Sequence, residues 1–171
     1  NTFVFPMELD NEFSLCSNIV LEIAPAEKGY LWVATSLGIN KFSLRERRVV
    51  ESYMQYVDVE NIASDSEGNT VLFSGEDFIT CYRPGRAFSE DVYIPGVRAA
   101  EIVAVWSEAP RVFCTLRRDG ELVRYRLNDG EGKSLVRVSG RQLSARPVRK
   151  AFFNGGRLHF VDTCLLYTSD A

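Results

Sequence analysis

The chain has 171 residues, of which 46% are hydrophobic and 12% aromatic, enough to bury a core and too many for an intrinsically disordered protein. It contains no apolar run near the roughly 20 residues of a membrane-spanning helix, and its first residues lack a signal-peptide pattern. Its net charge of −3 combines an acidic first half with a basic second half, but no dense run of Lys and Arg indicates a nucleic-acid partner.

The chain contains several copies of a repeat that is built from strand-like segments. The first copy holds four of them, at 18–24, 30–35, 39–43 and 49–56, which we expect to run from the innermost to the outermost strand of one sheet. The glycine before the second segment, Gly29, has its counterpart 39 residues later at Gly68. A period of about 40 to 45 residues with several short strands is typical of four-stranded propeller blades.

The sequence therefore predicts an all-β fold, a β-propeller fragment of about three and a half four-stranded blades. Because closed propellers have about 4–8 blades, we expect a partial propeller over residues 1–163, with open strand edges that favour poor solubility or oligomers. The predicted blades cover 14–56, 59–94, 100–138 and, incompletely, 147–163.

The segments that flank these copies receive separate predictions. Thr2–Phe5 is consistent with the outer strand of a preceding blade, and the first residue, Asn1 rather than Met, suggests that the natural chain begins upstream. Residues 164–171 read like a translated sequencing adapter and are predicted to be a non-native tail. In the second half, arginines alternate with apolar residues over 122–127, which predicts that they lie on the solvent face of a strand.

Cysteine and carboxylate spacing predicts no metal site. Cys16, Cys81, Cys114 and Cys164 form no CxxC pair and suggest no disulfide; Cys81 and Cys114 are expected to be small buried hydrophobes. The turn residues Asp65, Glu67 and Asp77 lack the spacing of a calcium loop and are expected to cap backbone groups.

Two residues invite a functional interpretation. Trp32 has an aromatic face that could stack on a sugar, but its place inside the repeated strand favours packing between blades. His159, the single histidine, occupies the matching position and has no identified partner for general-base catalysis. With no nucleophile elbow or phosphate loop either, we predict no catalytic residue, no metal ligand and no cofactor, and assign no ligand-binding residue.

The first copy nevertheless resembles a known family. Its segments are Leu15-Cys16-Ser17-Asn18-Ile19, Gly29-Tyr30-Leu31-Trp32-Val33-Ala34-Thr35 and Leu37-Gly38-Ile39-Asn40-Lys41-Phe42. They are similar to the two-component regulator propeller repeat, in which a Gly-x-Leu-Trp-Ile-Gly-Thr-like strand precedes a Gly-Leu-x-x-Phe/Tyr-like strand. The later copies depart from this pattern: Val71 and His159 stand in place of the Trp, and Asp77 in place of a Gly.

The resemblance implies a role in signalling. Proteins with this repeat are typically periplasmic sensor regions of bacterial hybrid two-component systems of the Bacteroides type. It implies an oligosaccharide as ligand, and as partners further blades, the signalling domains of a parent histidine kinase, and a second copy in a homodimer. The kinase itself would lie outside this fragment.

Two alternatives remain open from the residues alone. One is an enzymatic propeller, a lyase or glycosidase, in which inner-strand carboxylates act as acid and base. The carboxylates in question are Glu22 and Glu101. The other alternative is a scaffold that binds protein partners.

Overall fold

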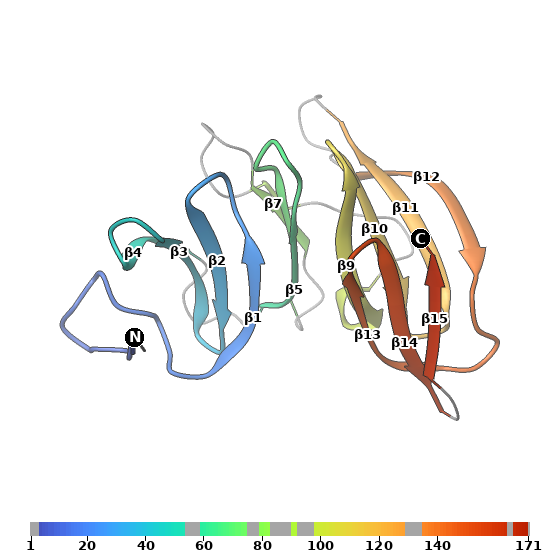
Figure 1. The fold of residues 1–171 in the computed structure, drawn as a ribbon, viewed down its shortest axis with the longest axis horizontal. Coiled ribbons are helices and arrows are strands. Elements are labelled where there is room, and N and C mark those ends of the chain that lie inside the picture. Colours follow the sequence, from blue (N-terminus) through green and yellow to red (C-terminus); the bar gives the residue numbers. More distant parts are fainter. Residues whose placement is uncertain are drawn as a thin grey trace.

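The fold of the chain is all-β. The computed structural model describes residues 4–53, 59–74, 79–82, 90–91, 98–128, 135–163 and 166–170. Its strands form four separate antiparallel sheets, three of four strands and one of three, and within each sheet the strands lie in chain order. In Figure 1 the first, second and third sheets follow one another along the molecule, and the fourth overlaps the third in this view.

The first two sheets occupy the N-terminal half. Aromatic and β-branched residues dominate strands such as β2, as expected of half-buried pleated surfaces. The first sheet contains β1 (Val20–Pro25), β2 (Tyr30–Thr35), β3 (Gly38–Ser43) and β4 (Arg48–Tyr53). The second contains β5 (Val59–Ser64), β6 (Thr70–Ser74), β7 (Ile79–Tyr82) and β8 (Glu90–Asp91).

The last two sheets follow a single 3-10 turn, η1 (Ala99–Glu101). The third contains β9 (Ile102–Ala109), β10 (Val112–Arg117), β11 (Glu121–Leu127) and β12 (Leu135–Gln142). The fourth contains β13 (Val148–Asn154), β14 (Arg157–Asp162) and β15 (Leu166–Asp170). Residues 166–170, which lie in the predicted tail, therefore pair with β14, while 164–165 and 171 lie outside the described residues.

Glycines form the tight connections that the sequence predicts. Gly38 follows the two-residue turn between β2 and β3 with a φ of +134°, and Gly68 has a φ of +83°. At Gly120, before β11, the φ is +87°, and a Cβ atom would collide with the carbonyl oxygen of Ser144. Only glycine fits such a position without strain.

Each sheet begins with the same irregularity in its first strand. One residue there is skipped in the pairing with the second strand, which makes a β-bulge. The skipped residue follows Val20, Val59, Ile102 or Val148 in the four sheets, respectively. The sheets are thus copies of one structural unit, and the residues just after the bulge occupy equivalent positions; they are Glu22, Asn61, Ala104 and Lys150.

Three hydrophobic clusters join the sheets in sequence. Trp32 and Ile62 belong to the cluster between the first and second sheets, and Phe113 and Val71 to that between the second and third. Leu116 and Phe160 belong to the cluster between the third and fourth sheets. Among the described residues no such cluster joins the fourth sheet back to the first. Within the described part of the chain, the sheets therefore form an open succession.

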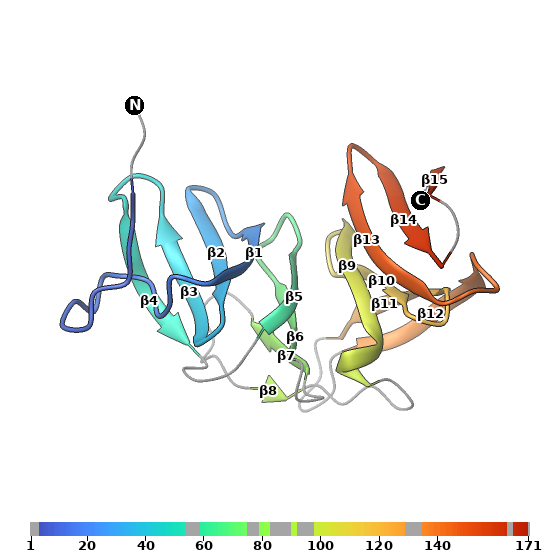
Figure 2. The ribbon, with the colours of Figure 1, turned by 90° about the horizontal axis from the view of Figure 1, so that it is seen from below.

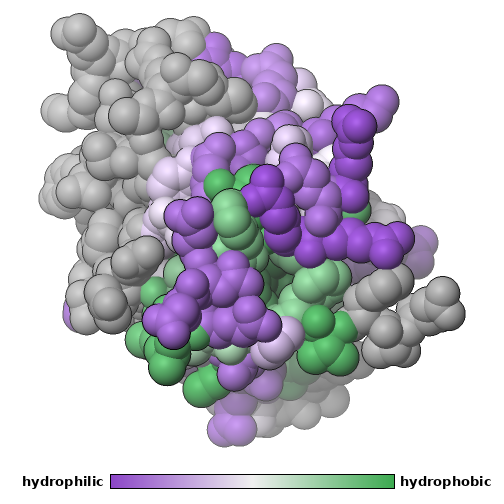
Figure 3. All heavy atoms as spheres, turned by 90° about the vertical axis from the view of Figure 1, so that its left-hand side faces the viewer, coloured by the Kyte–Doolittle hydropathy of each residue, from purple (hydrophilic) through white to green (hydrophobic). Residues whose placement is uncertain are grey.

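The segment before β1 packs along the first sheet without forming a strand. Val4 and Phe5, expected in an outer strand of a preceding blade, lie in irregular structure, and residues 1–3 are outside the described part. The Phe5 ring contacts Phe42 with centroids 4.9 Å apart, and the Arg48 guanidinium lies 4.2 Å from the Phe13 ring centroid. Figure 3 shows this end of the molecule, where hydrophobic and hydrophilic residues share the surface. No helix in the described part is long and apolar enough to span a membrane.

Candidate functional site

A groove runs between the first strands of all four sheets. Its walls come from β1, β5, β9 and β13, and its volume is about 600 Å³. Figure 2 shows these four strands next to one another where the sheets converge. Because segments more than 120 residues apart in sequence, β1 and β13, line one hollow, its shape is set by the packing of the whole fold rather than by a single loop.

Apolar and polar groups share the walls of the groove. Leu21 and Ile23 of β1 are 44% and 59% exposed, and Phe152 of β13 is 58% exposed. Val103 and Val105 of β9 are half-buried beside them. Exposed apolar side chains that gather in a concave surface, with a few polar groups among them, are typical of ligand sites.

Glu22 is a half-buried carboxyl group in this groove. Its Oε2 accepts a hydrogen bond of 3.0 Å from the backbone N–H of Ile62 on β5. Among the described residues no cationic side chain is paired with it. Burial raises the pKa of Glu22 to about 7, although the Ile62 N–H opposes this shift by favouring the charged form.

The equivalent residue of the second sheet makes a comparable bridge with a neutral side chain. Asn61 Nδ2 donates a hydrogen bond of 3.2 Å to the backbone carbonyl of Ile102 on β9. In the third and fourth sheets the position holds Ala104 and an exposed Lys150. The fold therefore does not require a charge at this position, and the groove collects a different side chain from each sheet.

Glu101 does not join Glu22, contrary to the expectation that both lie on inner strands. It lies in η1, before β9 begins, and does not line the groove. Its Oε2 accepts a hydrogen bond of 2.7 Å from Arg117 Nη2 on β10. The turn preceding β9 directs this carboxylate toward a basic side chain of its own sheet, so Glu101 serves a local ion pair.

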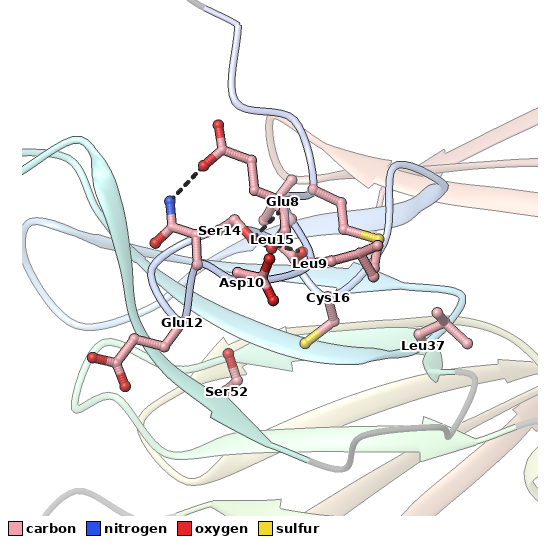
Figure 4. A pocket seen from close by; sticks show the side chains of 11 residues that line it. Glu8, Leu9, Asp10, Glu12, Ser14, Leu15, Cys16, Leu37 and Ser52 are labelled. Atoms are coloured by element: carbon pink, nitrogen blue, oxygen red, sulfur yellow. Dashed lines mark hydrogen bonds between the residues drawn. The ribbon is translucent and has the colours of Figure 1, made fainter.

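A second hollow, of about 470 Å³, lies at the N-terminal segment and is shown in Figure 4. Residues 7–16 form most of its lining, with Leu37 and Ser52 from the first sheet. Glu8 faces Asn11, whose Nδ2 donates a 2.7 Å hydrogen bond to Glu8 Oε2. Because one irregular segment supplies most of its walls, this hollow is a weaker candidate than the groove between the sheets.

The third sheet carries a buried thiol beside an ion pair. Cys114 Sγ lies 3.8 Å from Glu108 Oε2, and Glu108 is paired with Arg124. Burial, with the Glu108 carboxylate, raises the pKa of the thiol to about 11, so it stays protonated and weakly nucleophilic. Arg124 and Arg126 lie on the solvent side of the strand as expected, between the buried Val123, Tyr125 and Leu127: the Arg124 side chain is 43% exposed at the edge of a hollow, and Arg126 is exposed.

Trp32 and Asp65 have the structural roles expected from the sequence. Trp32 is fully buried between the first two sheets, and its Nε1 donates to Thr70 Oγ1 at 2.9 Å. Asp65 Oδ1 accepts the backbone N–H groups of Glu67 and Asn69 at 2.8 and 2.9 Å. Asp77, the third predicted turn carboxylate, lies outside the described residues.

His159 and the cysteines also fall within ordinary packing. The His159 ring is half-buried and stacks on Phe152, with centroids 4.8 Å apart. Cys81 and Cys114 are buried free thiols, as expected, and Cys16 is a half-buried free thiol; Cys164 lies outside the described residues. No group of three or more His, Cys, Asp or Glu side chains suited to a metal ion occurs in the described part.

Sequence reasoning missed most of the groove. Phe152, Glu60 and Lys150 were not singled out, although each lies on the first strand of its repeat. The signal in the sequence was a shared pattern at the start of each first strand: an aliphatic residue, the residue skipped in the pairing, and then the residue just after the bulge. That pattern is hard to recognise because the residue after the bulge differs in charge and size in every copy.

Comparison with known proteins shows similarity in fold alone. No protein-family model and no curated protein matches the chain. A solved structure of PorZ, described as an essential bacterial surface component of the type-IX secretion system of Porphyromonas gingivalis, matches with a TM-score of 0.60 and 10% identity. The match covers 91% of this chain and 21% of PorZ, so the chain spans about a fifth of that protein. The computationally designed Ika4 protein matches with a TM-score of 0.63 and 9% identity over 99% of both chains.

Proposed function

We propose that the chain is a ligand-binding β-propeller region of a bacterial two-component sensor, and that the groove between its inner strands holds the ligand. The observation that carries this proposal is that one strand from each of four equivalent sheets lines the same groove. Such a site stands on rigid strands, so binding energy is not spent on ordering loops.

The sensor role and the periplasmic location rest on the first repeat. Its Gly29–Phe42 segment resembles the two-component regulator propeller repeat, and β2 and β3 pair over that segment. PorZ, which shares the fold, is itself described as a bacterial surface component. In the proposed arrangement, occupancy of the groove shifts the equilibrium between two states of a parent kinase.

A saccharide is the ligand class that the resemblance favours. Phe152 offers an exposed aromatic ring to the groove, and its stacking on His159 holds the ring in place. Neighbouring apolar side chains can contact the C–H face of a sugar ring, and exposed backbone and polar groups can contact its hydroxyls.

Binding of neutral oligosaccharides to the chain tests the proposal. We would titrate gluco-, xylo- and manno-oligosaccharides by calorimetry and locate the perturbed residues by NMR. Phe152→Ala should weaken binding of a responsive sugar about fivefold or more, because one aromatic contact contributes on the order of 1 kcal/mol. Val136→Ala, at a similarly exposed residue of β12, is the matched control. Binding that perturbs only residues 7–16, or that Phe152→Ala leaves unchanged, would contradict the proposal.

The gene itself tests the signalling part. The sequence beyond the codon for Thr163 should encode further blades, an immunoglobulin-like domain, a membrane span and a histidine-kinase core. A short reading frame that ends soon after Ala171 in genomic sequence would remove the support for a sensor and favour a stand-alone binding protein.

One observation favours an enzymatic alternative, a lyase or glycosidase. A carboxyl group with a pKa near 7, as Glu22 has, is suited to general-acid catalysis. The groove also holds Glu60, whereas Glu101 is engaged by Arg117. Turnover of any bound oligosaccharide that is abolished by both Glu22→Gln and Glu60→Gln would establish this alternative; turnover that persists in both variants would dismiss it.

A further inference from the structure

The charge on Glu22 is not needed for the contact it makes with the neighbouring sheet. At the equivalent position of the second sheet, Asn61 bridges to β9 with a neutral amide. Glutamine could accept the Ile62 N–H in the same way as Glu22 does. The first sheet instead holds an ionisable group that is costly to desolvate, so the carboxylate calls for an explanation outside the packing of the sheets.

The surroundings of Glu22 supply no compensating cation. Among the groove residues, β5 contributes Glu60, β13 contributes Lys150, and Val103–Ser107 of β9 contribute no charge. On β2, the residue paired with Glu22 is Ala34. Both Glu60 and Lys150 are exposed to solvent, and no ion pair between Glu22 and Lys150 is formed. The groove therefore has one more acidic than basic side chain and a carboxylate with unused acceptor capacity.

We propose that the groove selects ligands that carry a protonated amine on a body with an apolar face, and that Glu22 recognises the ammonium group. This inference rests on the proposed binding function and adds the charge of the ligand to it. Leu21, Ile23 and Phe152 contact the apolar face, while the carboxylate accepts charge-assisted hydrogen bonds. An amino sugar and an alkyl amine share this chemistry.

Because Glu22 can ionise, the proposal predicts how the affinity for an amine changes with pH. Burial raises the pKa of Glu22 to about 7. An ammonium group binds the carboxylate form of Glu22 better than its carboxylic acid form. Binding of an alkyl amine, which stays protonated over this interval, should therefore tighten from pH 5.5 to pH 8. The other charged groups of the groove are Glu60 and Lys150, and both are exposed.

Two pairs of probes that differ in charge test the inference on the chain by calorimetry, the alkyl pair at pH 8 and the sugar pair at pH 7, because the amines of amino sugars are weaker bases than alkyl amines and lose much of their charge by pH 8. One pair is the glucosamine disaccharide and its N,N′-diacetylated form; the other is hexylammonium and hexanol. We expect the ammonium member of at least one pair to bind about tenfold more tightly than its neutral partner. One charge-assisted hydrogen bond accounts for a ratio of dissociation constants of about this size. The pair that shows the preference distinguishes an amino sugar from a simple amine.

Variants assign the preference to Glu22. Glu22→Gln keeps an acceptor for Ile62 N–H and should abolish the preference, whereas Glu51→Gln removes an exposed carboxylate of β4 and should leave it intact. If charged and neutral members bind equally and Phe152→Ala weakens both, the inference is overturned while the binding function stands. If no probe perturbs the groove, and the neutral oligosaccharides also leave it unperturbed, both are overturned.

Discussion

The first and the last interfaces between sheets join equivalent units by different chemistry. Between the first and second sheets, Trp32 packs against Tyr82, with ring centroids 5.1 Å apart, and the ammonium of Lys41 lies within this aromatic cluster. Between the third and fourth sheets, Trp106 stacks on Phe153 at 5.0 Å in an apolar cluster.

The two tryptophans illustrate the difference. Trp32 Nε1 donates to Thr70 Oγ1, whereas Trp106 Nε1 is buried without a hydrogen-bond partner in the described part of the chain. A polar interface needs correctly placed partners, while an apolar one needs mainly volume. The repeat therefore preserves the succession of sheets and leaves the chemistry between them free to vary.

Removal of Trp32 should have the largest effect on stability. Trp32→Ala deletes a fully buried indole and should lower the free energy of unfolding by about 3–5 kcal/mol, as measured by urea denaturation. Phe152→Ala, at a largely exposed aromatic residue, is the control and should cost less than about 1 kcal/mol. Similar losses for the two variants would contradict the described packing of the first interface.

Substitution of Lys41 tests whether the interface between the first and second sheets depends on the ion pair of Lys41 with Glu27. The Lys41 ammonium is paired with Glu27 and lies 5.0 Å from the Tyr30 ring centroid. Burial lowers the pKa of Lys41, but the hydrogen bond and charge of Glu27, together with Tyr82 and Glu51, outweigh burial and raise it. Lys41→Met leaves the Glu27 carboxylate without its partner and should cost about 2 kcal/mol.

The double variant sharpens this test. Lys41→Met combined with Glu27→Gln removes both charges, so it should recover much of the lost stability. A double variant no more stable than Lys41→Met alone would show that Lys41 acts through packing of its aliphatic stem rather than through charge.

Glu22 should make the first interface sensitive to pH. Its folded pKa, about 7, lies above the ordinary value of 4.5, so the folded state holds this proton more tightly than the unfolded state. Its stabilising contribution is complete below pH 4.5 and is lost as the pH rises through 7. Glu22→Gln should therefore match the wild type near pH 4 and exceed it at pH 8, by on the order of 2 kcal/mol. Denaturation at several pH values measures this difference, and a difference independent of pH would contradict it.

The fold could be predicted further from the sequence than the site could. Short apolar segments and turn glycines such as Gly38 are local signals, and they predicted the all-β class and antiparallel sheets. The position of Glu101 was mispredicted because a 3-10 turn shifts the start of β9 by two residues relative to the expected inner strand. The groove depends on how four sheets pack, and no local pattern in the chain specifies that Phe152 faces the same space as Leu21.

Substitution of Thr70 should have the smallest effect on stability, and it tests the one hydrogen bond by which Trp32 differs from Trp106. Thr70→Val removes the acceptor of the Trp32 N–H at nearly constant volume, and should cost about 1–2 kcal/mol because a buried donor is left unpaired. In the last interface, Trp106→Phe removes an indole N–H that already lacks a described partner, so its cost should arise from lost volume alone. Combining Thr70→Val with Trp32→Phe should then cost less than the sum of the two single changes, since the second removes the donor that the first leaves unpaired. Strict additivity in that cycle would mean that the Trp32–Thr70 bond contributes nothing, and the two interfaces would then differ in composition but not in how they are stabilised.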